Sequence, residues 1–483
     1  MKAVTLALAA CLVGPALASG PDTLWLRTID LGSDERGYGI ASRGKVIVVA
    51  GGKWVNVSND ILVVKMTQDG DTVWTRTFDG GSDDGAYSAC MDNSGNVIVA
   101  GYGYLFRDGD RGGHRGLFDL VRRPPDAKQA ELAFVVKYDS LGELQWSRTD
   151  PNHLLVGVTA DTAGNCYVSG VSVDSSSYDL WLAKLNPSGD TVWTRTFDFA
   201  PIEIGYRVAL DGSGNIITCA YVGDFSNFDC LTLKLTPSGD TIWTRRYDRT
   251  ADDACLGIAV DPLGNVVVAG RTVKDSLGDA LVLKYDSGGT LIWDRTYDFG
   301  ADEGVMGAAC DSTGDIYVTG FTGMYYVYDC LTLKLDSAGA MLWSATYGGS
   351  SDDEANDVAC DTLGNPIIAG YVTDSITSGT DVLAAKYSSL TGVAEAPQAS
   401  PAPRLAHGAL IAAPEFVLAV EISGRYDVKL CDLAGRVRQQ LFRGTLTKGA
   451  HRLSVSAIPA GAYFVRVAAP DGGISCQRLL LVK

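Results

Sequence analysis

Short apolar runs separated by polar, turn-forming residues follow one another along most of this chain. The segment around residues 86–150 contains the runs AYSACMD (86–92), NVIVAG (96–101), AFVVKYD (133–139) and LQWSRTD (144–150). Runs of this length and composition, bounded by Gly, Asn, Asp and Ser, predict β-strands. Four such predicted strands make one unit of the chain.

The unit recurs at a nearly constant interval, which makes it a structural repeat. A strand containing Trp and a strand ending in Lys each occur seven times, and D-x-x-G-N turns recur with them. The tryptophans stand at 25, 74, 146, 193, 243, 293 and 343, and the lysines at 65, 137, 184, 234, 284, 334 and 386. Four strands per repeat predict an all-β, seven-bladed β-propeller with four-stranded blades.

The two ends of the repeat array predict how the ring closes. The array begins with a Trp strand, DTLWLRTID, and finishes with a Lys strand, DVLAAKYSS, so the last blade lacks an outer strand. We expect the N-terminal strand to complete that blade, which removes an open sheet edge. The small-residue strands, such as AYSACMD, should line the central channel, and the bulky Trp strands should lie outermost.

The repeated Trp phrase has a structural explanation. Residues at alternate positions of a strand share one face, so Trp74, Arg76 and Phe78 point the same way. Aromatic rings can fill the wedge between blades, and the planar guanidinium can stack on them. We therefore interpret the phrase as part of the framework and not as a catalytic motif.

Residues 74–101, WTRTFDGGSDDGAYSACMDNSGNVIVAG, carry a Trp strand, an acidic Gly-rich loop and a D-x-x-G-N turn. This segment resembles the bacterial SBBP-type β-propeller repeats, and the resemblance extends over about residues 22–390. It implies the propeller fold and hardly bears on activity.

Both ends of the chain predict export. Residues 1–20 have Lys2, an apolar stretch and Ala16-Leu17-Ala18, which together predict a cleavable signal peptide; lipidation at Cys11 is the alternative. The propeller is expected over 21–390, and the Pro- and Ala-rich stretch 391–404 reads as a linker. We found no other stretch that could span a membrane.

Residues 405–483 form a separate predicted module. The chain from residue 404 onward has eleven Lys and Arg against five Asp and Glu, although the whole protein has a net charge of −17. Its short strand-like runs predict a small Ig-like β-sandwich. VKLCDLAGRV, IPAGAYFVRV and QRLLLVK resemble the C-terminal sorting domain of type IX secretion. This resemblance implies the type IX machinery as a partner and release to the medium or attachment to the cell surface. The usual Asn-Pro near the module start is missing, so an ordinary sandwich appendage is the alternative.

Charge and composition exclude some function classes. A net charge of −17 argues against nucleic-acid binding. The four histidines stand in no zinc motif, and neither a nucleophile elbow nor a phosphate-binding loop occurs. Most of the eleven cysteines should be small apolar core residues, with one candidate disulfide between Cys219 and Cys230.

Acidic pairs precede several of the predicted innermost strands. Carboxylates beside Gly residues could bind calcium through oxygen ligands. The alternative is solvated loops or salt bridges to the repeated Arg and Lys. The ring is interrupted by PNHLL and PIEIG, where no such pair occurs. The candidate calcium ligands are Asp83, Asp84, Asp252, Asp253, Asp302, Glu303, Asp352 and Asp353, and Asp34-Glu35 is a further pair.

An insertion over about residues 102–131 distinguishes the second repeat. Alternating strand directions place it on the same face as the acidic pairs, so it could cap the channel mouth. A long loop in a compact repeat protein is often functional, and the alternative is a variable loop without a ligand. The candidate ligand-binding residues are Arg107, Arg111, His114, Arg115, Arg122 and Arg123.

Two function classes follow from these features. The first is an exported, non-catalytic scaffold for binding or adhesion, with an extracellular protein or glycan as ligand, calcium as the candidate cofactor and a monomeric state. The second is a propeller enzyme that is quinoprotein-dehydrogenase-like or glycan-cleaving. KYDSLGELQW resembles the tryptophan-docking repeats of quinoproteins, although those are usually eight-bladed and no matching cofactor site is visible.

Overall fold

The structure is a computed structural model of the 483-residue chain. The residues it describes are 21–55, 58–81, 84–103, 133–173, 177–224, 227–249, 252–274, 277–324, 327–349, 351–374, 379–389, 410–411, 415–420, 423–431, 437–447, 449–454, 461–468 and 474–481. The chain divides into two compact units, residues 1–392 and residues 393–483. The predicted signal peptide and the predicted linker lie outside the described residues.

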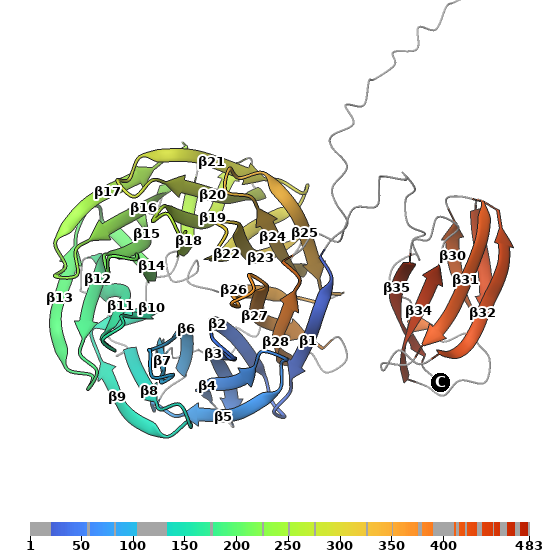
Figure 1. The fold of residues 1–483 in the computed structure, drawn as a ribbon, viewed down its shortest axis with the longest axis horizontal. Coiled ribbons are helices and arrows are strands. Elements are labelled where there is room, and N and C mark those ends of the chain that lie inside the picture. The colour runs from blue at the N-terminus through green and yellow to red at the C-terminus, as the bar shows by residue number, and fades with distance from the viewer. Residues whose placement is uncertain are drawn as a thin grey trace, which may run out of the picture. The chain divides into compact units, whose positions relative to one another are not determined.

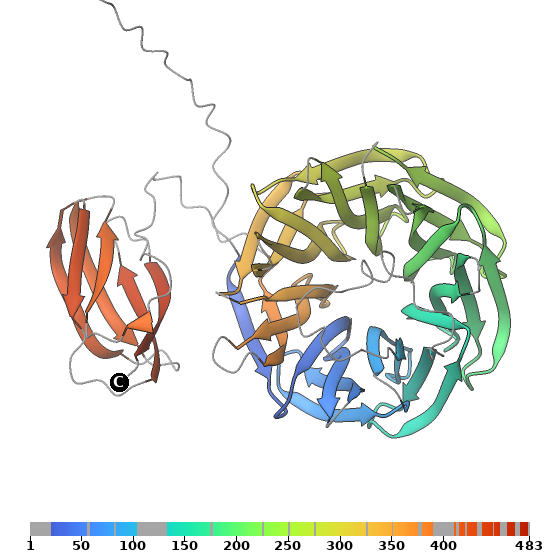
Figure 2. The same ribbon diagram turned by 180° about the vertical axis from the view of Figure 1, so that it is seen from behind.

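The first unit is a β-propeller, in which four-stranded antiparallel sheets surround a central axis (Figures 1 and 2). Seven such blades are present among the described residues. Blade 1 is β2 (Glu35–Arg43), β3 (Val46–Val55), β4 (Ser58–Thr67) and β5 (Thr72–Phe78), and blade 2 is β6 (Asp84–Met91), β7 (Val97–Gly103), β8 (Ala133–Tyr138) and β9 (Leu144–Asp150). Blade 3 is β10 (His153–Ala160), β11 (Cys166–Val173), β12 (Tyr178–Leu185) and β13 (Thr191–Phe197), and blade 4 is β14 (Ile202–Leu210), β15 (Ile216–Asp224), β16 (Asn227–Leu235) and β17 (Thr241–Tyr247).

The remaining blades repeat this order. Blade 5 is β18 (Asp252–Val260), β19 (Val266–Lys274), β20 (Leu277–Tyr285) and β21 (Leu291–Tyr297), and blade 6 is β22 (Asp302–Cys310), β23 (Ile316–Met324), β24 (Val327–Leu335) and β25 (Met341–Tyr347). Blade 7 is β26 (Glu354–Cys360), β27 (Pro366–Thr373), β28 (Thr380–Tyr387) and β1 (Thr23–Ile29). The small-residue strands lie around the centre and the Trp strands outermost, as predicted (Figure 1).

The ring closes through the N-terminal strand. β1 pairs antiparallel with β28, and the register sets Trp25 opposite Lys386 and Ile29 opposite Val382. The other Trp and Lys strands have the same register; Trp293, for example, is opposite Lys284. The predicted closure is confirmed. Blades 3 and 4 are additionally joined into one eight-stranded sheet by a parallel bridge between Tyr178 and Ile202.

Two rims of the propeller are used below. The loop rim is the end at which the innermost strands begin and the blade-to-blade segments run, beside Glu35 and Asp84. The turn rim is the opposite end, where the D-x-x-G-N turns such as 92–96 and the turns before the Trp strands, such as 139–143, close their hairpins. The direction of the strands assigns every loop to one of these rims.

The second strand of most blades contains a glycine, such as Gly270 in β19, because a larger residue would not fit there. The innermost strand has a bulge, for example between Cys255 and Gly257, which pushes a carbonyl toward the second strand. A Cβ at Gly270 would stand only 1.8 Å from the Ala254 carbonyl oxygen. In blade 4 the glycine is on the innermost strand, as Gly205, and Ala220 stands opposite.

Backbone contacts between neighbouring innermost strands leave little room at the centre of the ring. A Cβ at Gly39 would lie 2.7 Å from the Ser88 Cα, and one at Gly307 would lie 2.7 Å from the Asp357 Cα. Side chains larger than hydrogen at these two positions would push the blades apart. The glycines therefore set how tightly the ring can close.

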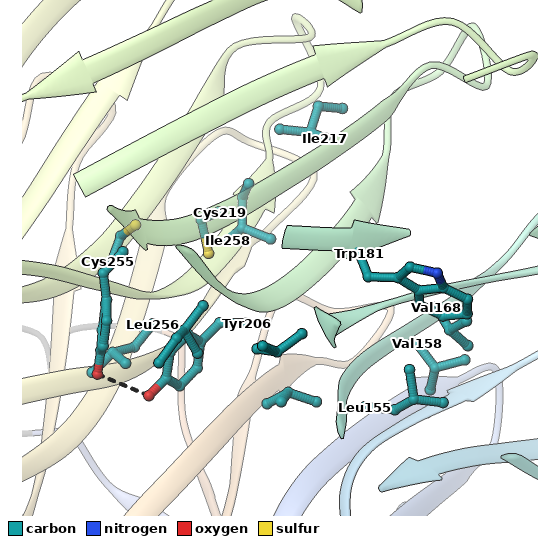
Figure 3. Packing of buried hydrophobic residues seen from close by; sticks show 14 of the residues in the cluster. Leu155, Val158, Val168, Trp181, Tyr206, Ile217, Cys219, Cys255, Leu256 and Ile258 are labelled. Carbon is teal, nitrogen blue, oxygen red and sulfur yellow. Dashed lines mark hydrogen bonds between the residues drawn. The ribbon is translucent and has the colours of Figure 1, made fainter. Parts of the chain in front are cut away.

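Buried side chains between blades form the core. Figure 3 shows Tyr206, Cys219, Cys255 and Leu256 packed where blades 4 and 5 meet. The hydroxyl groups of Tyr206 and Tyr221 share a hydrogen bond of 2.8 Å. The candidate disulfide is wrong. Cys219 is opposite Thr232, whereas Cys230 is opposite Tyr221, and both are free thiols.

The second unit contains two sheets. The larger has the order β29 (Leu410–Ile411), β35 (Ile474–Leu481), β34 (Gly461–Ala468), β31 (Gly424–Cys431) and β32 (Val437–Leu446). The smaller pairs β30 (Glu415–Val420) with β33 (Gly449–Ser454). The alternation of apolar residues on β31 buries Tyr426, Val428 and Leu430. Across the described part of both units there is no helix, and so none that could span a membrane.

Candidate binding face and central channel

The repeated Trp and Lys strands latch each blade to the next at the turn rim. In blade 5, Lys284 Nζ lies 3.0 Å from Asp261 Oδ2 of its own blade. It also donates to the Ser337 carbonyl of blade 6 at 3.1 Å, and the Trp293 indole N–H donates to the same oxygen at 3.2 Å. The Arg295 guanidinium lies over the Trp293 ring at 5.7 Å. The structural interpretation of the Trp phrase is confirmed.

The turn aspartates at this rim are fully satisfied. Asp261 Oδ1 accepts hydrogen bonds from the backbone N–H groups of Leu263 and Asn265, and Oδ2 accepts one from the Asn265 side chain. Burial alone would raise the pKa of Asp261, but the hydrogen bonds from Asn265 and Lys284 outweigh it and hold the pKa below its ordinary value. The same balance lowers the pKa of four equivalent residues: Asp92, Asp161, Asp211 and Asp361.

The first residue of three described acidic pairs, at the loop rim, contacts the preceding blade, and that of the fourth contacts its own blade. A carboxylate oxygen accepts a backbone N–H from the third strand of that blade in three junctions. These bonds are Thr380 N to Asp34 Oδ1 at 3.1 Å, Phe228 N to Asp252 Oδ1 at 3.1 Å, and Gly278 N to Asp302 Oδ1 at 2.8 Å. At the remaining described pair, Asp352 Oδ2 accepts the Tyr371 hydroxyl at 2.9 Å.

The second residue of each pair is buried and holds its own loop. Asp84 accepts the Gly80 N–H at 2.6 Å, Asp253 the Arg249 N–H at 2.7 Å and Glu303 the Ala301 N–H at 3.0 Å. Asp353 accepts the N–H groups of Gly349 and Thr373, at 3.0 Å and 2.8 Å. Among these eight candidate calcium ligands, Asp252 and Asp302 contact the preceding blade, the second residues of the pairs hold the blade-to-blade loops, and Asp83 lies outside the described residues. Calcium at the pairs stays a prediction.

Burial dominates the electrostatics of these inner carboxylates. It raises the pKa of Asp353 to about 6, with smaller contributions from Asp329 and Asp352. It raises the pKa of Asp253 and of Glu303 as well. The loop rim therefore holds acids that resist ionisation, the opposite of the turn rim.

One of the two apparent interruptions in the acidic ring does contain an equivalent acid. Glu203, within PIEIG, is fully buried and accepts the Phe199 N–H at 2.9 Å, the same role as Glu303. Burial and the charges of Asp179 and Asp198 raise the pKa of Glu203 to about 7. In blade 3, His153 takes this position and stacks on Trp181 at 4.0 Å.

Groups of three carboxylates were missed by sequence reasoning. Among the described residues three groups have carboxylate oxygens within 4.8 Å of one another, and each combines a third strand, the end of a Trp strand and the next innermost strand. They are Asp30, Glu35 and Asp381; Asp179, Asp198 and Glu203; and Asp279, Asp298 and Glu303. Of these residues, Glu303 belonged to the candidate calcium ligands and Glu35 to the further acidic pair. The signal was an Asp five residues before the Lys of most Lys strands.

The candidate ligand-binding residues Arg107, Arg111, His114, Arg115, Arg122 and Arg123 lie outside the described residues. The strands that carry the insertion are described: Gly103 at the end of β7 is opposite Asp84, and Ala133 at the start of β8 is opposite Tyr102. Both strand ends thus lie at the loop rim. Beside them the rings of Tyr38, Tyr87 and Tyr102 stack at centroid distances of 5.0 Å and 4.7 Å.

A single arginine connects the innermost strands of distant blades. Arg207 of blade 4 donates to the Tyr87 carbonyl at 2.7 Å and to the Tyr38 carbonyl at 3.2 Å, and it lies 3.4 Å from Asp357 of blade 7. Asp357 in turn accepts the Ile40 N–H at 3.1 Å. Burial raises the pKa of Asp357, and the Arg207 charge opposes that rise. The arginine thus ties blades 1, 2, 4 and 7 together.

A cavity of about 350 Å³ lies in the turn-rim half of the channel. Its lining includes Arg43, Met91, Arg207 and Asp357, and most of the remaining lining is aliphatic or backbone. Arg207 and Asp357 are committed to the contacts above. Two of its polar lining residues therefore serve to hold the blades together, and we assign no ligand to the cavity.

Comparison with known proteins finds only distant structural likenesses. No protein-family model matches the chain, and no curated protein is similar to it in sequence. Solved structures that are similar include the Dos1 propeller, at 9% identity over 76% of this chain and 94% of that chain, with a TM-score of 0.43. Others are Chaetomium thermophilum Sqt1 bound to the N-terminus of ribosomal protein L10, at 10% identity over 74% and 98% with a TM-score of 0.44, and a PL25 ulvan lyase bound to -[GlcA(1-4)Rha3S]-, at 10% over 74% and 95% with a TM-score of 0.45. Likenesses this distant do not transfer a ligand or a reaction to this chain.

Proposed function

We propose that this protein is an exported, non-catalytic propeller scaffold that binds a protein or glycan ligand at its loop rim. The contact surface is formed by Tyr38 and Tyr87, which stack with the buried Tyr102, together with the basic insertion that follows β7. Partly exposed aromatic rings beside polar and basic groups are typical of recognition surfaces.

The observation that carries the proposal is the difference in solvent exposure between the acidic and the aromatic side chains at this rim. Two acids with a raised pKa, Glu203 and Glu303, would be candidates for proton transfer, but both side chains are 0% exposed. A general acid must come within hydrogen-bond reach of its substrate. Tyr38 and Tyr87, by contrast, are only half-buried. The rim therefore favours contact over chemistry.

Ligand capture from intact cells and on a glycan array tests the binding surface. We expect deletion of residues 107–123 to abolish capture without lowering the melting temperature by more than a few degrees. Tyr87→Ser should weaken capture about tenfold, since an aromatic hot spot contributes more than about 1 kcal/mol. Leu263→Ser and Leu363→Ser are matched controls, because these side chains are 83% and 79% exposed in the turns of the other rim. Capture that survives the deletion, or that fails equally in the controls, would refute the assignment.

We also propose that residues 405–483 direct export, on the strength of the resemblance to type IX sorting domains. A fusion of this module to a passenger protein should reach the medium or the cell surface in a host with that secretion system. The same fusion should stay inside a host that lacks it. Equal retention in both hosts would leave the module as a structural appendage.

A further inference from the structure

Two junctions of the loop rim bring three carboxylates together. At the junction of blades 3 and 4 these are Asp179, Asp198 and Glu203, and at the junction of blades 5 and 6 they are Asp279, Asp298 and Glu303. Three negative charges this close repel one another, and a bound cation would remove that cost. Within the described residues, neither glutamate has an ion-pair partner.

The buried glutamate of each group has an oxygen left over. Oε1 of Glu203 accepts the Phe199 N–H, and Oε1 of Glu303 accepts the Ala301 N–H and the Thr322 hydroxyl. Oε2 of each has no hydrogen-bond partner among the described residues, although both side chains are fully buried. A buried carboxylate oxygen without a partner is costly, so it needs a ligand.

The spacing of these oxygens fits calcium. Ca²⁺ binds oxygen ligands at about 2.3–2.6 Å, so two of its ligands lie no more than about 5 Å apart. The oxygens of each group lie within 4.8 Å of one another. Asp198 and Asp298 are exposed, which gives the ion a path from solvent and leaves room for water ligands.

Two other junctions supply a cation from the chain itself. Next to Glu35, Lys53 Nζ lies 3.5 Å from Oε1. Between blades 4 and 5, Arg246 forms an ion pair with the buried Asp229. The residues equivalent to Arg246 are Thr196 and Thr296 in blades 3 and 5, so those two blades lack a cation at this position. At the junction of blades 5 and 6, Arg271 forms an ion pair with Asp302 and not with the three carboxylates of the group.

We infer that the protein binds two Ca²⁺ ions between blades, one at Asp179–Asp198–Glu203 and one at Asp279–Asp298–Glu303. Each ion connects the outer part of one blade to the innermost strand of the next. The first site lies beside the Tyr178–Ile202 bridge, where the two sheets already join.

Calorimetric titration of the chelator-treated, full-length protein with CaCl2 tests the inference. The expected stoichiometry is about two ions per chain, and 1 mM CaCl2 should raise the Tm by at least about 3 °C over EGTA. MgCl2 should give a clearly smaller shift, because Mg²⁺ demands near-octahedral geometry.

Variants at the exposed ligands separate the two sites. Asp198→Asn and Asp298→Asn should each bind one ion, and the double variant should bind none while its Tm in EGTA is no lower than that of the native protein. Asp248→Asn, at the junction that holds Arg246, is the matched control and should still bind two. Absence of Ca²⁺ binding at 1 mM, equal shifts with Mg²⁺, or full binding by the double variant would each overturn the inference.

Discussion

The two rims of the propeller are built from the same repeats, but their buried carboxylates have opposite surroundings. At the turn rim a buried aspartate such as Asp261 meets a lysine, an asparagine and two backbone N–H groups, and its pKa falls. At the loop rim burial, and then the charges of two more acids, raise the pKa of an acid such as Glu203 to about 7. One rim is electrostatically complete, whereas the other has an excess of negative charge. A protein built from uniform repeats can thus have uncompensated carboxylates, which could bind cations, on one face only.

Breaking an ion pair at the turn rim should have the largest effect. Lys284→Met leaves Asp261 charged and buried, so we expect a loss of about 3–5 kcal/mol in the free energy of unfolding. Lys65→Met is the matched control, because the first repeat has Ser42-Arg43-Gly44 in place of the D-x-x-G-N aspartate, and it should cost roughly 1 kcal/mol. Urea unfolding followed by Trp fluorescence measures both. Equal losses would show that the aspartate is unimportant.

The pH dependence of stability should separate the rims. The native pKa of Asp353 is about 6 and its ordinary value is 3.8, so the folded state holds a proton that the unfolded state lacks between these values. Stability attributable to Asp353 therefore falls as the pH rises from about 4 to 6, by up to about 1.4 kcal/mol per unit.

Asp353→Asn should flatten this part of the stability profile. Asp361→Asn, at the turn rim, should not, because the lowered pKa of Asp361 gives stability that is lost only below its ordinary value of 3.8. Chemical unfolding across this pH range measures both slopes. A slope unchanged in Asp353→Asn would contradict the assignment.

Relieving the repulsion at one loop-rim junction should stabilise the protein. In EGTA near pH 8, Glu203→Gln keeps an acceptor for the Phe199 N–H and removes one charge, so we expect a gain of about 2 kcal/mol. In saturating CaCl2 the gain should shrink or reverse, since the native protein then gains from the ion and the variant does not. A loss of stability in EGTA would mean that the three charges are tolerated.

The smallest expected effect concerns one tryptophan of the turn rim. Trp343 is fully buried, but its indole N–H has no hydrogen-bond partner among the described residues, whereas Trp293 donates to Ser337. Trp343→Phe should therefore cost about 1 kcal/mol less than Trp293→Phe. Thermal unfolding of the two variants decides it, and equal costs would imply a partner for Trp343.

Much of the fold could be predicted because the same sequence motifs recur in every blade. The Trp and Lys strands are opposite each other in every blade, and the closure by β1 followed from the order of these phrases at the two ends. The reason for the phrases was less visible: Lys284 and Trp293 share one carbonyl of the next blade, a contact between residues some 50 positions apart.

The candidate site was predicted less well, because its parts are separated along the chain. Glu203 was overlooked since PIEIG has no acidic pair, and its neighbour Asp179 comes from a strand 24 residues earlier. Arg207 occupies a position where five of the other repeats have Gly or Ser. The repeat pattern therefore gave no indication that its side chain contacts the innermost strands of other blades. The basic insertion and the export signals stay predictions.

Closure by β1 makes blade 7 a composite of the first and last parts of the propeller, Thr23–Ile29 and Glu354–Tyr387. During synthesis the first strand must wait for more than three hundred residues before its partner emerges. If β1 detaches from β28, it can instead pair with the exposed β28 of a second molecule and complete that molecule's blade 7. The same strand that seals the monomer is thus its simplest route to an exchanged dimer.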